Sequence, residues 1–439
     1  MIPAPPPFLA APLARPVAIF GAGVSGQGVR GLLAALGFSS VIYDQRAAES
    51  RPEFTAREAA QHGLVVFSPG FPPGHPWLVA AREAGCTCLG ELDFASLFWR
   101  GELIAITGTN GKTTLTEFLA HALNHAGRRA AVTGNVGYPF SRLVVEMADG
   151  SMTAESAPGD ERSGTAVPAI AVCEVSSFQA ETLQHFRPSA TLWTNFAEDH
   201  LERHPGLDAY FRAKWALVER TPAAGVLVGT SVHTFALNSG LTLPRSAALL
   251  TEGRPRDARV AGTVFEHYPQ YENFLLAQAW WHRAGLPETA LIEAARSFRL
   301  GAHRMARVGE KRGVTFWNDS KATNFHAVEA ALGAFAEPVL WIGGGKAKGG
   351  DLGGFVRRIA RHIRHAFLIG ETQAPLAAHC RDLQVPATPC ATLAAAVQAA
   401  VSRAVAGDHV VLSPGFASFD MFRGYDDRGR QFESLVGNL

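Results

Sequence analysis

The sequence predicts an α/β protein of three units, each a mostly parallel sheet with crossover helices. Short β-branched runs alternate with Ala- and Leu-rich helical patterns along nearly all of the chain, a pattern typical of parallel sheets. The chain has 439 residues, which suffices for about three domains at a prior of about 150 residues each. Its hydrophobic content of 47% is enough for several cores, which excludes a disulfide-stapled miniprotein or a disordered chain.

The first unit is expected over residues 1–100 as a Rossmann-like domain. Its predicted strands are 16–20, 41–44 and 64–70, with a helix near 75–85. A glycine-rich turn, GAGVSG at 21–26, follows the first strand directly and opens a helix. Its glycines allow backbone amides to approach a pyrophosphate, and Asp44, about 20 residues further on, can accept a hydrogen bond from a ribose hydroxyl. The motif alone leaves open an NAD or FAD site, a site for another nucleotide, or a tight turn.

The second unit, expected over 101–301, is a P-loop ATPase-type α/β domain with a mostly parallel sheet. The predicted strands are 103–107, 172–177 and 191–196, and the predicted helices lie near 207–220, 272–284 and 287–298. Residues 149–168 are rich in Ser, Ala, Gly and Pro, so they predict a surface insertion without chemistry.

The segment ITGTNGKTT (106–114) stands between a strand and a helix, which is the context that a phosphate-binding loop needs. Amides of its turn can cradle phosphates, Lys112 can reach the β and γ oxygens, and Thr113 can join a Mg²⁺ shell. Ile106 replaces the first glycine of the strict motif, yet an ATP site is favoured over a structural turn.

Two residues at the ends of later strands are candidate metal ligands. Glu174 lies in an apolar strand, where a carboxylate is costly unless it meets a cation. His200 follows the next strand in NFAEDHLERH. A buried structural carboxylate at Glu174 and a hydrogen-bonded histidine at His200 remain the alternatives.

The third unit, expected over 302–439, is a second Rossmann-like domain. Its predicted strands are 314–319, 338–345, 365–370 and 409–415, with helical patterns between them.

Charge and hydropathy exclude several classes of function. Forty Lys and Arg against 39 Asp and Glu leave a formal charge of +1, so no overall attraction favours nucleic acid or an acidic membrane. No run approaches eighteen apolar residues, and the proline-broken start lacks the pattern of a signal peptide. Five sparse cysteines fit a reducing compartment. We expect a cytoplasmic protein that binds neither nucleic acid nor membrane, and we expect it to be a monomer.

Eight motifs that follow GAGVSG in order carry a resemblance to a known family. They are GTNGKTT (108–114), TGNVG (133–137), EVSSFQ (174–179), NFAEDHLERH (195–204), GAHRMARV (301–308), NDSKATN (318–324), GGKAKGGDL (344–352) and SPGFASFDMF (413–422). In this arrangement the sequence resembles, over nearly its whole length, the Mur ligases of bacterial cell-wall synthesis. The resemblance implies ATP-dependent addition of D-glutamate to UDP-N-acetylmuramoyl-L-alanine, with Mg²⁺ at two sites. It also shifts the interpretation of GAGVSG from a dinucleotide to a uridine nucleotide.

The resemblance implies roles for individual residues. The implied catalytic residues are Lys112, Glu174, His200, Lys214 and Lys321. The implied ATP-binding residues are Gly108, Thr109, Asn110, Gly111, Lys112, Thr113, Thr114, Asn273, Arg304 and Asp319. The implied metal ligands are Thr113, Glu174, His200 and Lys214. Lys214 falls where this family has a lysine carbamylated by CO₂, a change that converts a cation into an anion able to support Mg²⁺.

The two remaining substrates have implied residues of their own. Those for the UDP-linked substrate are Val24, Ser25, Asp44, Arg46, Ser68, Gly70 and Asn135. Those for the amino acid are Thr323, Lys348, Ser418, Phe419 and Tyr425. Lys348 fits this role because a dicarboxylate needs a cation beside it.

Three alternatives stay open. One is a ligase of the same fold that uses another amino acid, such as L-glutamate, or another acyl acceptor. The second is a nicotinamide-dependent oxidoreductase using GAGVSG and Asp44, which would leave GTNGKTT unexplained. The third is a nucleotide-binding protein without catalysis, which is disfavoured by the presence together of Lys112, Glu174, His200 and Lys214.

Overall fold

The computed structural model describes residues 1–149, 169–247 and 254–439. All of the predicted insertion except Asp149 therefore lies outside the described residues. The chain forms three sheets and divides into two compact units. Unit 1 holds residues 1–195, 211–263 and 272–298, and unit 2 holds 196–210, 264–271 and 299–439.

The first sheet of unit 1 is fully parallel, with the strand order β2-β1-β3-β4. Its strands are β1 (Val17–Phe20), β2 (Ser40–Tyr43), β3 (Leu64–Phe67) and β4 (Thr87–Gly90), and its helices are α1 (Val24–Ala35), α2 (Ala56–Ala59), α3 (Pro76–Glu83) and α4 (Glu91–Ser96). Alternate residues of β1 enter two different cores, because successive side chains of a strand point to opposite faces. Strands are confirmed at all three predicted places, but β3 ends at Phe67, before the end of the predicted strand 64–70, and β4 was not predicted.

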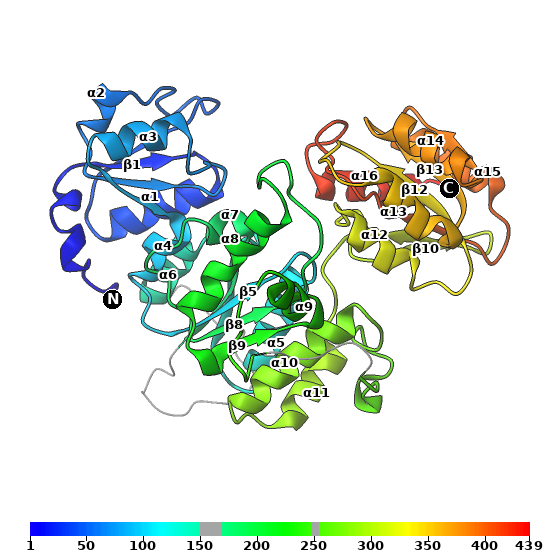
Figure 1. The fold of residues 1–439 in the computed structure, drawn as a ribbon, viewed down its shortest axis with the longest axis horizontal. Helices are drawn as coiled ribbons and strands as arrows, with labels where there is room; N and C mark the ends of the chain where they lie inside the picture. Colours follow the sequence, from blue (N-terminus) through cyan, green and yellow to red (C-terminus); the bar gives the residue numbers. More distant parts are fainter. Residues whose placement is uncertain (150–168, 248–253) are drawn as a thin grey trace. The chain divides into compact units, whose positions relative to one another are not determined.

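The central sheet of unit 1 is also parallel, with the order β6-β7-β5-β8-β9. Its strands are β5 (Glu102–Thr107), β6 (Ala130–Gly134), β7 (Ile170–Glu174), β8 (Ala190–Trp193) and β9 (Val226–Val228). The helices are α5 (Lys112–His125), α6 (Phe140–Asp149), α7 (Ser177–Ala180), α8 (Leu207–Arg220), α9 (Thr230–Asn238), α10 (Gln270–Arg283) and α11 (Glu288–Ser297). Figure 1 shows α5, α10 and α11 beside this sheet.

The predicted strand 172–177 was wrong at its end. β7 stops at Glu174, and α7 begins at Ser177. The cause is a capping box, in which the Ser176 side chain accepts from the Gln179 amide while the Gln179 side chain accepts from the Ser176 amide. This early stop leaves Glu174 as the last residue of its strand.

Two buried carboxylates of α4 hold the first and central sheets in one unit. Asp93 accepts hydrogen bonds from the backbone amides of residues 184–186. Glu91 accepts from the amide and the hydroxyl of Ser141, both at 2.7 Å. The two substrate regions predicted in these sheets therefore share one framework.

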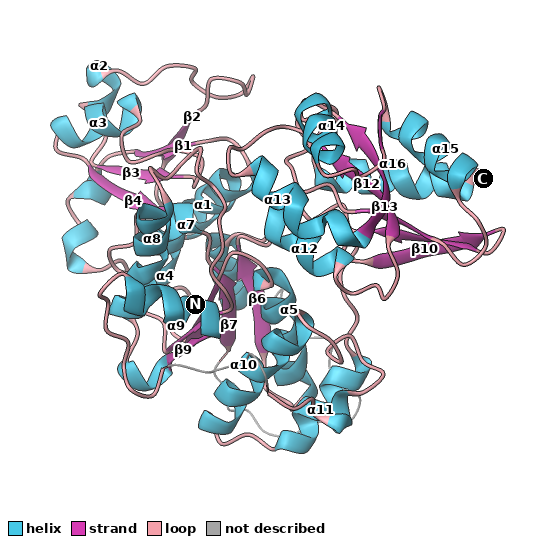
Figure 2. Cartoon of the chain, turned by 45° about the vertical axis from the view of Figure 1, so that its right-hand side comes forward, coloured by secondary structure: helices cyan, strands magenta, loops and turns pink. Residues whose placement is uncertain are grey.

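Unit 2 holds a six-stranded sheet with the order β10-β11-β15-β12-β13-β14. Its strands are β10 (Ala306–Lys311), β11 (Val314–Asn318), β12 (Val339–Gly344), β13 (Ile363–Ile369), β14 (Ala387–Pro389) and β15 (His409–Leu412). Its helices are α12 (Phe325–Leu332), α13 (Leu352–Ile359), α14 (Gln373–Asp382), α15 (Leu393–Arg403) and α16 (Tyr425–Gly437). The first three helices cover one face, and α15 and α16 cover the other (Figure 2). Only the β10–β11 hairpin is antiparallel in this sheet, and the sequence did not predict it.

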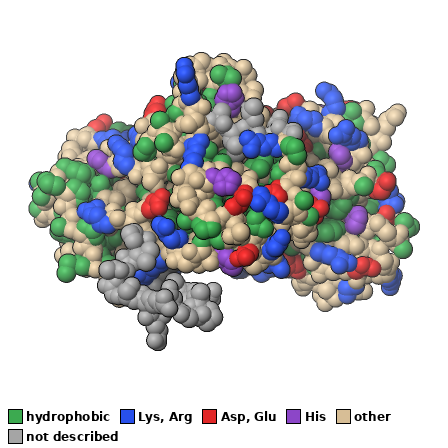
Figure 3. Space-filling model, turned by 90° about the horizontal axis from the view of Figure 1, so that it is seen from below, with side chains coloured by type: hydrophobic (Ala, Val, Ile, Leu, Met, Phe, Trp, Pro, Cys, Tyr) green, Lys and Arg blue, Asp and Glu red, His purple; other side chains and the backbone are tan. Residues whose placement is uncertain are grey.

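Five 3-10 turns complete the described secondary structure: η1 (Pro7–Leu9), η2 (Pro12–Ala14), η3 (Ala223–Gly225), η4 (Ala258–Val260) and η5 (Ala360–His362). On the face drawn in Figure 3, Lys and Arg side chains are interspersed with Asp and Glu. Among the described helices, none has the length and apolar character needed to cross a membrane.

Candidate active site

The phosphate-binding loop lies between β5 and α5, at residues 108–111. Gly108 has φ 153° and Gly111 has φ 79°, a region that side chains rarely adopt. A Cβ at Gly108 would stand 1.9 Å from Oγ1 of Thr194. The Lys112 ammonium donates to the carbonyls of Gly108 at 3.0 Å and Thr109 at 2.8 Å. A cation and the amide end of a helix thus meet at one loop, which is an arrangement suited to phosphate.

Two distant predicted residues pack against this loop. Asn273 of α10 is buried, and its side chain lies where a Cβ at Gly111 would collide with it, at 2.6 Å. Lys214 of α8 is 1% exposed. Its ammonium donates to the Gly108 carbonyl at 2.9 Å and to the Thr107 hydroxyl at 3.3 Å. The structure therefore brings Lys112, Lys214 and Asn273 together.

Glu174 lies at the end of β7 and is 2% exposed. Its Oε1 accepts from the Asn135 side chain at 2.9 Å, and its backbone carbonyl accepts from the Asn135 amide. Its Oε2 is buried without a hydrogen-bond partner among the described residues. A buried carboxylate oxygen without a partner is costly unless a cation meets it, so Glu174 fits a metal ligand.

The predicted metal ligands are divided between the units: Thr113, Glu174 and Lys214 lie in unit 1, and His200 lies in unit 2. In the described part of the chain, no three His, Cys, Asp or Glu side chains form a group that could hold a metal. Mg²⁺ usually binds to one or two carboxylates together with substrate phosphates. The residues present fit a Mg²⁺ ion that arrives with a nucleotide.

The residues predicted for the UDP-linked substrate, Asn135 apart, lie at the carboxyl edge of the first sheet. The Asp44 carboxylate accepts from the amides of Ala22 and Arg46, each at 2.8 Å, and these bonds hold its pKa below the usual value. A Cβ at Gly21 would stand 2.8 Å from Oγ of Ser68. Asp44 and Ser68 therefore flank the glycine-rich turn. The other predicted residues at this edge are partly or fully exposed: Val24, Ser25, Arg46 and Gly70.

In unit 2, Arg304 and Asp319 lie on adjoining loops. Asp319 accepts from the Ser413 hydroxyl at 2.8 Å and from the Met305 amide at 3.2 Å. Burial raises the pKa of its carboxyl to about 7, although both hydrogen bonds and the nearby Arg304 act in the opposite direction. One guanidinium nitrogen of Arg304, Nη2, is buried without a partner in the described residues.

This raised pKa makes stability depend on pH. The pKa of Asp319 is about 7 in the folded chain, against 3.8 as its ordinary value. Between these values the folded state keeps a proton that the unfolded state has lost, so the free energy of unfolding falls as pH rises. Asparagine does not titrate, so Asp319→Asn should not show this loss. The free energy of unfolding of the variant, relative to that of the parent, should rise by about 1–4 kcal/mol between pH 5 and pH 8. Urea unfolding of both proteins at pH 5 and pH 8 measures this change. If the variant and the parent differ by the same free energy at both pH values, the raised pKa of Asp319 is wrong.

Two predicted residues, one implied for catalysis and one for the amino acid, meet at the start of α16. The Lys321 ammonium donates to the Tyr425 hydroxyl at 3.2 Å and lies 4.8 Å from the centre of its ring. The Ser320 hydroxyl donates to the Tyr425 carbonyl at 2.7 Å. Lys321, implied for catalysis, and Tyr425, implied for the amino acid, thus form one cluster.

Arg428 is a residue that sequence reasoning missed. It is fully buried, and burial lowers its pKa to about 10. Its guanidinium donates to the hydroxyl and carbonyl of Ser320 and to the Phe416 carbonyl. It therefore ties the loop of Asp319 and Lys321 to the loop that precedes Ser418. In the sequence, nothing distinguishes it from the exposed Arg430 two residues later.

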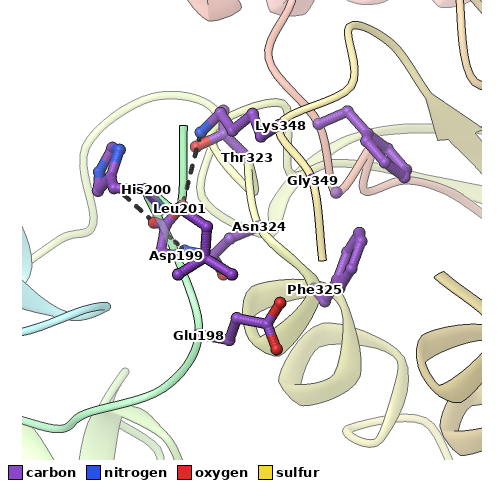
Figure 4. A pocket seen from close by; sticks show the side chains of 11 residues that line it. Glu198, Asp199, His200, Leu201, Thr323, Asn324, Phe325, Lys348 and Gly349 are labelled. Atoms are coloured by element: carbon purple, nitrogen blue, oxygen red, sulfur yellow. Dashed lines mark hydrogen bonds and ion pairs between the residues drawn. The ribbon is translucent and has the colours of Figure 1, made fainter. Parts of the chain in front are cut away.

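A pocket of about 320 Å³ lies within unit 2 (Figure 4). It is lined by Glu198, Asp199, His200, Leu201, Thr323, Asn324, Phe325, Lys348, Gly349, Gly415 and Phe416. The Asp199 carboxylate contacts three other residues of this pocket. It accepts hydrogen bonds from the Asn324 side chain at 3.0 Å and from the His200 amide at 2.9 Å, and it lies 3.7 Å from the Lys348 ammonium. Burial lowers the pKa of His200.

Of the residues implied for the amino acid, this pocket brings together Thr323 and Lys348. Ser418 is buried outside its lining, and Phe419 is 70% exposed. Asp199, which lies beside Lys348, and Asn324, which donates to Asp199, were not predicted, since their meeting joins segments more than a hundred residues apart.

Comparison with known proteins gives the family. A UDP-N-acetylmuramoylalanine–D-glutamate ligase of Gloeobacter violaceus is 36% identical, over 96% of this chain and 99% of its own. This chain belongs to the Mur ligase family. A ligase of the same name from Aquifex aeolicus is 32% identical, over 95% of this chain and 97% of its own. The family models Mur ligase middle domain and Mur ligase, glutamate ligase domain match residues 106–237 and 303–416.

Solved structures show that the fold is that of a Mur ligase. The UDP-N-acetylmuramate-alanine ligase MurC of Thermotoga maritima superposes with a TM-score of 0.57 at 17% identity, over 97% of this chain and 99% of its own. The MurF ligase of the same organism, in complex with ADP, superposes with a TM-score of 0.56 at 15% identity, over 88% of this chain and 98% of the MurF chain. The predicted family and the predicted fold class, an α/β protein with mostly parallel sheets, are confirmed.

Proposed function

We propose that this Mur ligase joins D-glutamate to UDP-N-acetylmuramoyl-L-alanine by an amide bond, with ATP converted to ADP and phosphate. The observation that carries the proposal is the loop at 108–111, where Lys112 and Lys214 contact the same carbonyl, in a chain that matches ligases of this name over nearly its whole length. The oxidoreductase alternative leaves this loop without a purpose.

The reaction has two halves. The alanine carboxylate attacks the γ-phosphorus of ATP, which forms an acyl phosphate and releases ADP. The amine of glutamate then attacks the acyl carbon, the C–O bond to phosphate breaks, and the amine loses a proton as the amide forms. Phosphoryl transfer requires little covalent chemistry from the protein, so catalysis rests on alignment and on stabilising charge.

The residues of the phosphate-binding loop perform the first half. Amides at the start of α5 and the Lys112 ammonium neutralise charge that develops on the γ-phosphate. Mg²⁺, when bound, would supply further positive charge, with Thr113, Glu174 and His200 as its holders. Carbamylation of the buried Lys214 would add an anion beside them.

The proposal assigns the remaining predicted residues as the sequence did. Asn273, Arg304 and Asp319 bind adenosine, and Lys321 acts near the γ-phosphate. The edge of the first sheet, with Asp44 and Ser68, binds the uridine diphosphate, and Asn135 adds a contact to the sugar. Thr323, Lys348, Ser418, Phe419 and Tyr425 bind glutamate. The domains proposed for these tasks span residues 1–100, 101–301 and 302–439, in a cytoplasmic monomer.

A phosphate-release assay tests the proposal directly. Purified protein with Mg·ATP and UDP-N-acetylmuramoyl-L-alanine is supplied in parallel with D-glutamate, L-glutamate, L-alanine, glycine or diaminopimelate. Release that depends on D-glutamate is expected. Release with another amino acid alone would keep the ATP chemistry and overturn the amino-acid assignment, and no release with any of them would overturn the acyl acceptor.

A further inference from the structure

The pocket of unit 2 holds more negative than positive side chains. Among its lining residues, Glu198 and Asp199 are acidic and Lys348 is the one lysine or arginine. Asp199, whose side chain is 7% exposed, already lies beside the Lys348 ammonium. The lysine of this pocket therefore has a counter-ion of its own, and a second carboxylate remains.

That second carboxylate, Glu198, makes no hydrogen bond or ion pair with any residue that the structure describes. Figure 4 shows it on the Phe325 side of the pocket, apart from Asp199 and Lys348. Its Oε1 stands 2.7 Å from the position that a Cβ at Gly350 would take. Gly350 thus leaves the space that this carboxylate occupies.

A local structural role does not account for Glu198. The nearest candidate role is capping of α12, which begins at Phe325. Asn324 already provides that cap, because its side chain accepts from the Ala327 amide at 2.9 Å. The Glu198 carboxylate lines the pocket and has no partner among the residues that the structure describes.

We propose that Glu198 binds the ammonium group of the incoming amino acid. This inference rests on the proposed function. A free amino acid with a carboxylate side chain brings two negative groups and one positive group. Lys348 and the hydroxyl of Thr323 suit a carboxylate, but an ammonium group that leaves water needs an acceptor, and a carboxylate is the strongest one. Glu198 supplies that acceptor at the other side of the same pocket.

Glu198→Gln tests this assignment when two ligands are compared. The variant should raise the KM for D-glutamate about 10- to 100-fold, as expected when a charge-assisted hydrogen bond is weakened. Glutarate, which has the same two carboxylates and no ammonium group, is measured as a competitive inhibitor. Its Ki should stay within about twofold or fall, because the substitution removes a negative charge that it does not use. Glu337→Gln, an exposed glutamate outside the pocket in the same unit, is the matched control.

Each other outcome has a definite meaning. An unchanged KM for D-glutamate in Glu198→Gln overturns the inference. A parallel rise in KM and in the Ki of glutarate also overturns it, because the pocket as a whole would then have been damaged. Absence of D-glutamate-dependent phosphate release in the wild-type protein instead overturns the proposed function, and the inference falls with it.

Discussion

Lys112→Ala is expected to nearly abolish ligation, with a fall in kcat of about 10²- to 10³-fold. The Lys112 ammonium is held over the phosphate-binding loop by the carbonyls of Gly108 and Thr109, where it can neutralise charge on the γ-phosphate. Removal of one such preorganised group commonly costs about 3–4 kcal/mol of transition-state stabilisation. The first half-reaction should fail, so ADP and phosphate should both be lost as products.

The fold should survive this substitution, because Lys112 is half-buried at a helix start and fills no core position. Thermal unfolding of the variant checks that point, and phosphate release checks activity. Lys311→Ala is the control, since Lys311 is a half-buried lysine at the end of β10 that donates only to the Gly437 carbonyl among the described residues. Turnover near the wild-type rate in Lys112→Ala would remove the loop from the mechanism.

Sequence alone predicted the parts of the site that are built locally. The loop at 108–111 stands between the strand and helix that the pattern required, because glycine conformations and helix starts depend on nearby residues. Glu174 was singled out by the cost of a carboxylate in an apolar strand. In the structure, one oxygen of that carboxylate, Oε2, is buried and has no hydrogen-bond partner among the described residues.

The parts that the sequence could not predict are pairings between distant segments. Asp199 meets Asn324 and Lys348 only because three loops of unit 2 converge. In the sequence, Arg428 is one of several charged residues of a polar helix. Only the fold shows that it is buried against Ser320. The antiparallel β10 has a short, half-exposed pattern that differs little from a loop. In each case residue type and spacing are compatible with several partners, and tertiary packing selects one.

Asn135 makes a contact with Glu174 that its sequence motif did not indicate. The sequence implied a contact to the sugar of the UDP-linked substrate. The structure places the Asn135 side chain on Oε1 of Glu174, so this amide fixes the orientation of the carboxylate. It leaves Oε2 as the oxygen available to a cation, which makes the charge of Glu174 testable apart from its position.

Glu174→Gln should lower kcat by about 10²- to 10³-fold and make turnover more dependent on Mg²⁺. Glutamine has nearly the same shape, and its carbonyl can keep the bond from Asn135. The substitution therefore removes the negative charge and leaves the packing of β7 in place. A metal that has lost one anionic ligand binds more weakly, and a higher Mg²⁺ concentration should restore part of the rate.

Turnover measured across a series of Mg²⁺ concentrations distinguishes this role from a structural one. Glu91→Gln is the matched control, because Glu91 is another buried carboxyl of unit 1 that bonds Ser141 and lies on α4, away from the phosphate-binding loop in the chain. That control should keep the Mg²⁺ dependence of the wild type. If Glu174→Gln shows that same dependence with an undiminished rate, the oxygen without a partner serves no metal, and the buried structural carboxylate becomes the correct interpretation of Glu174.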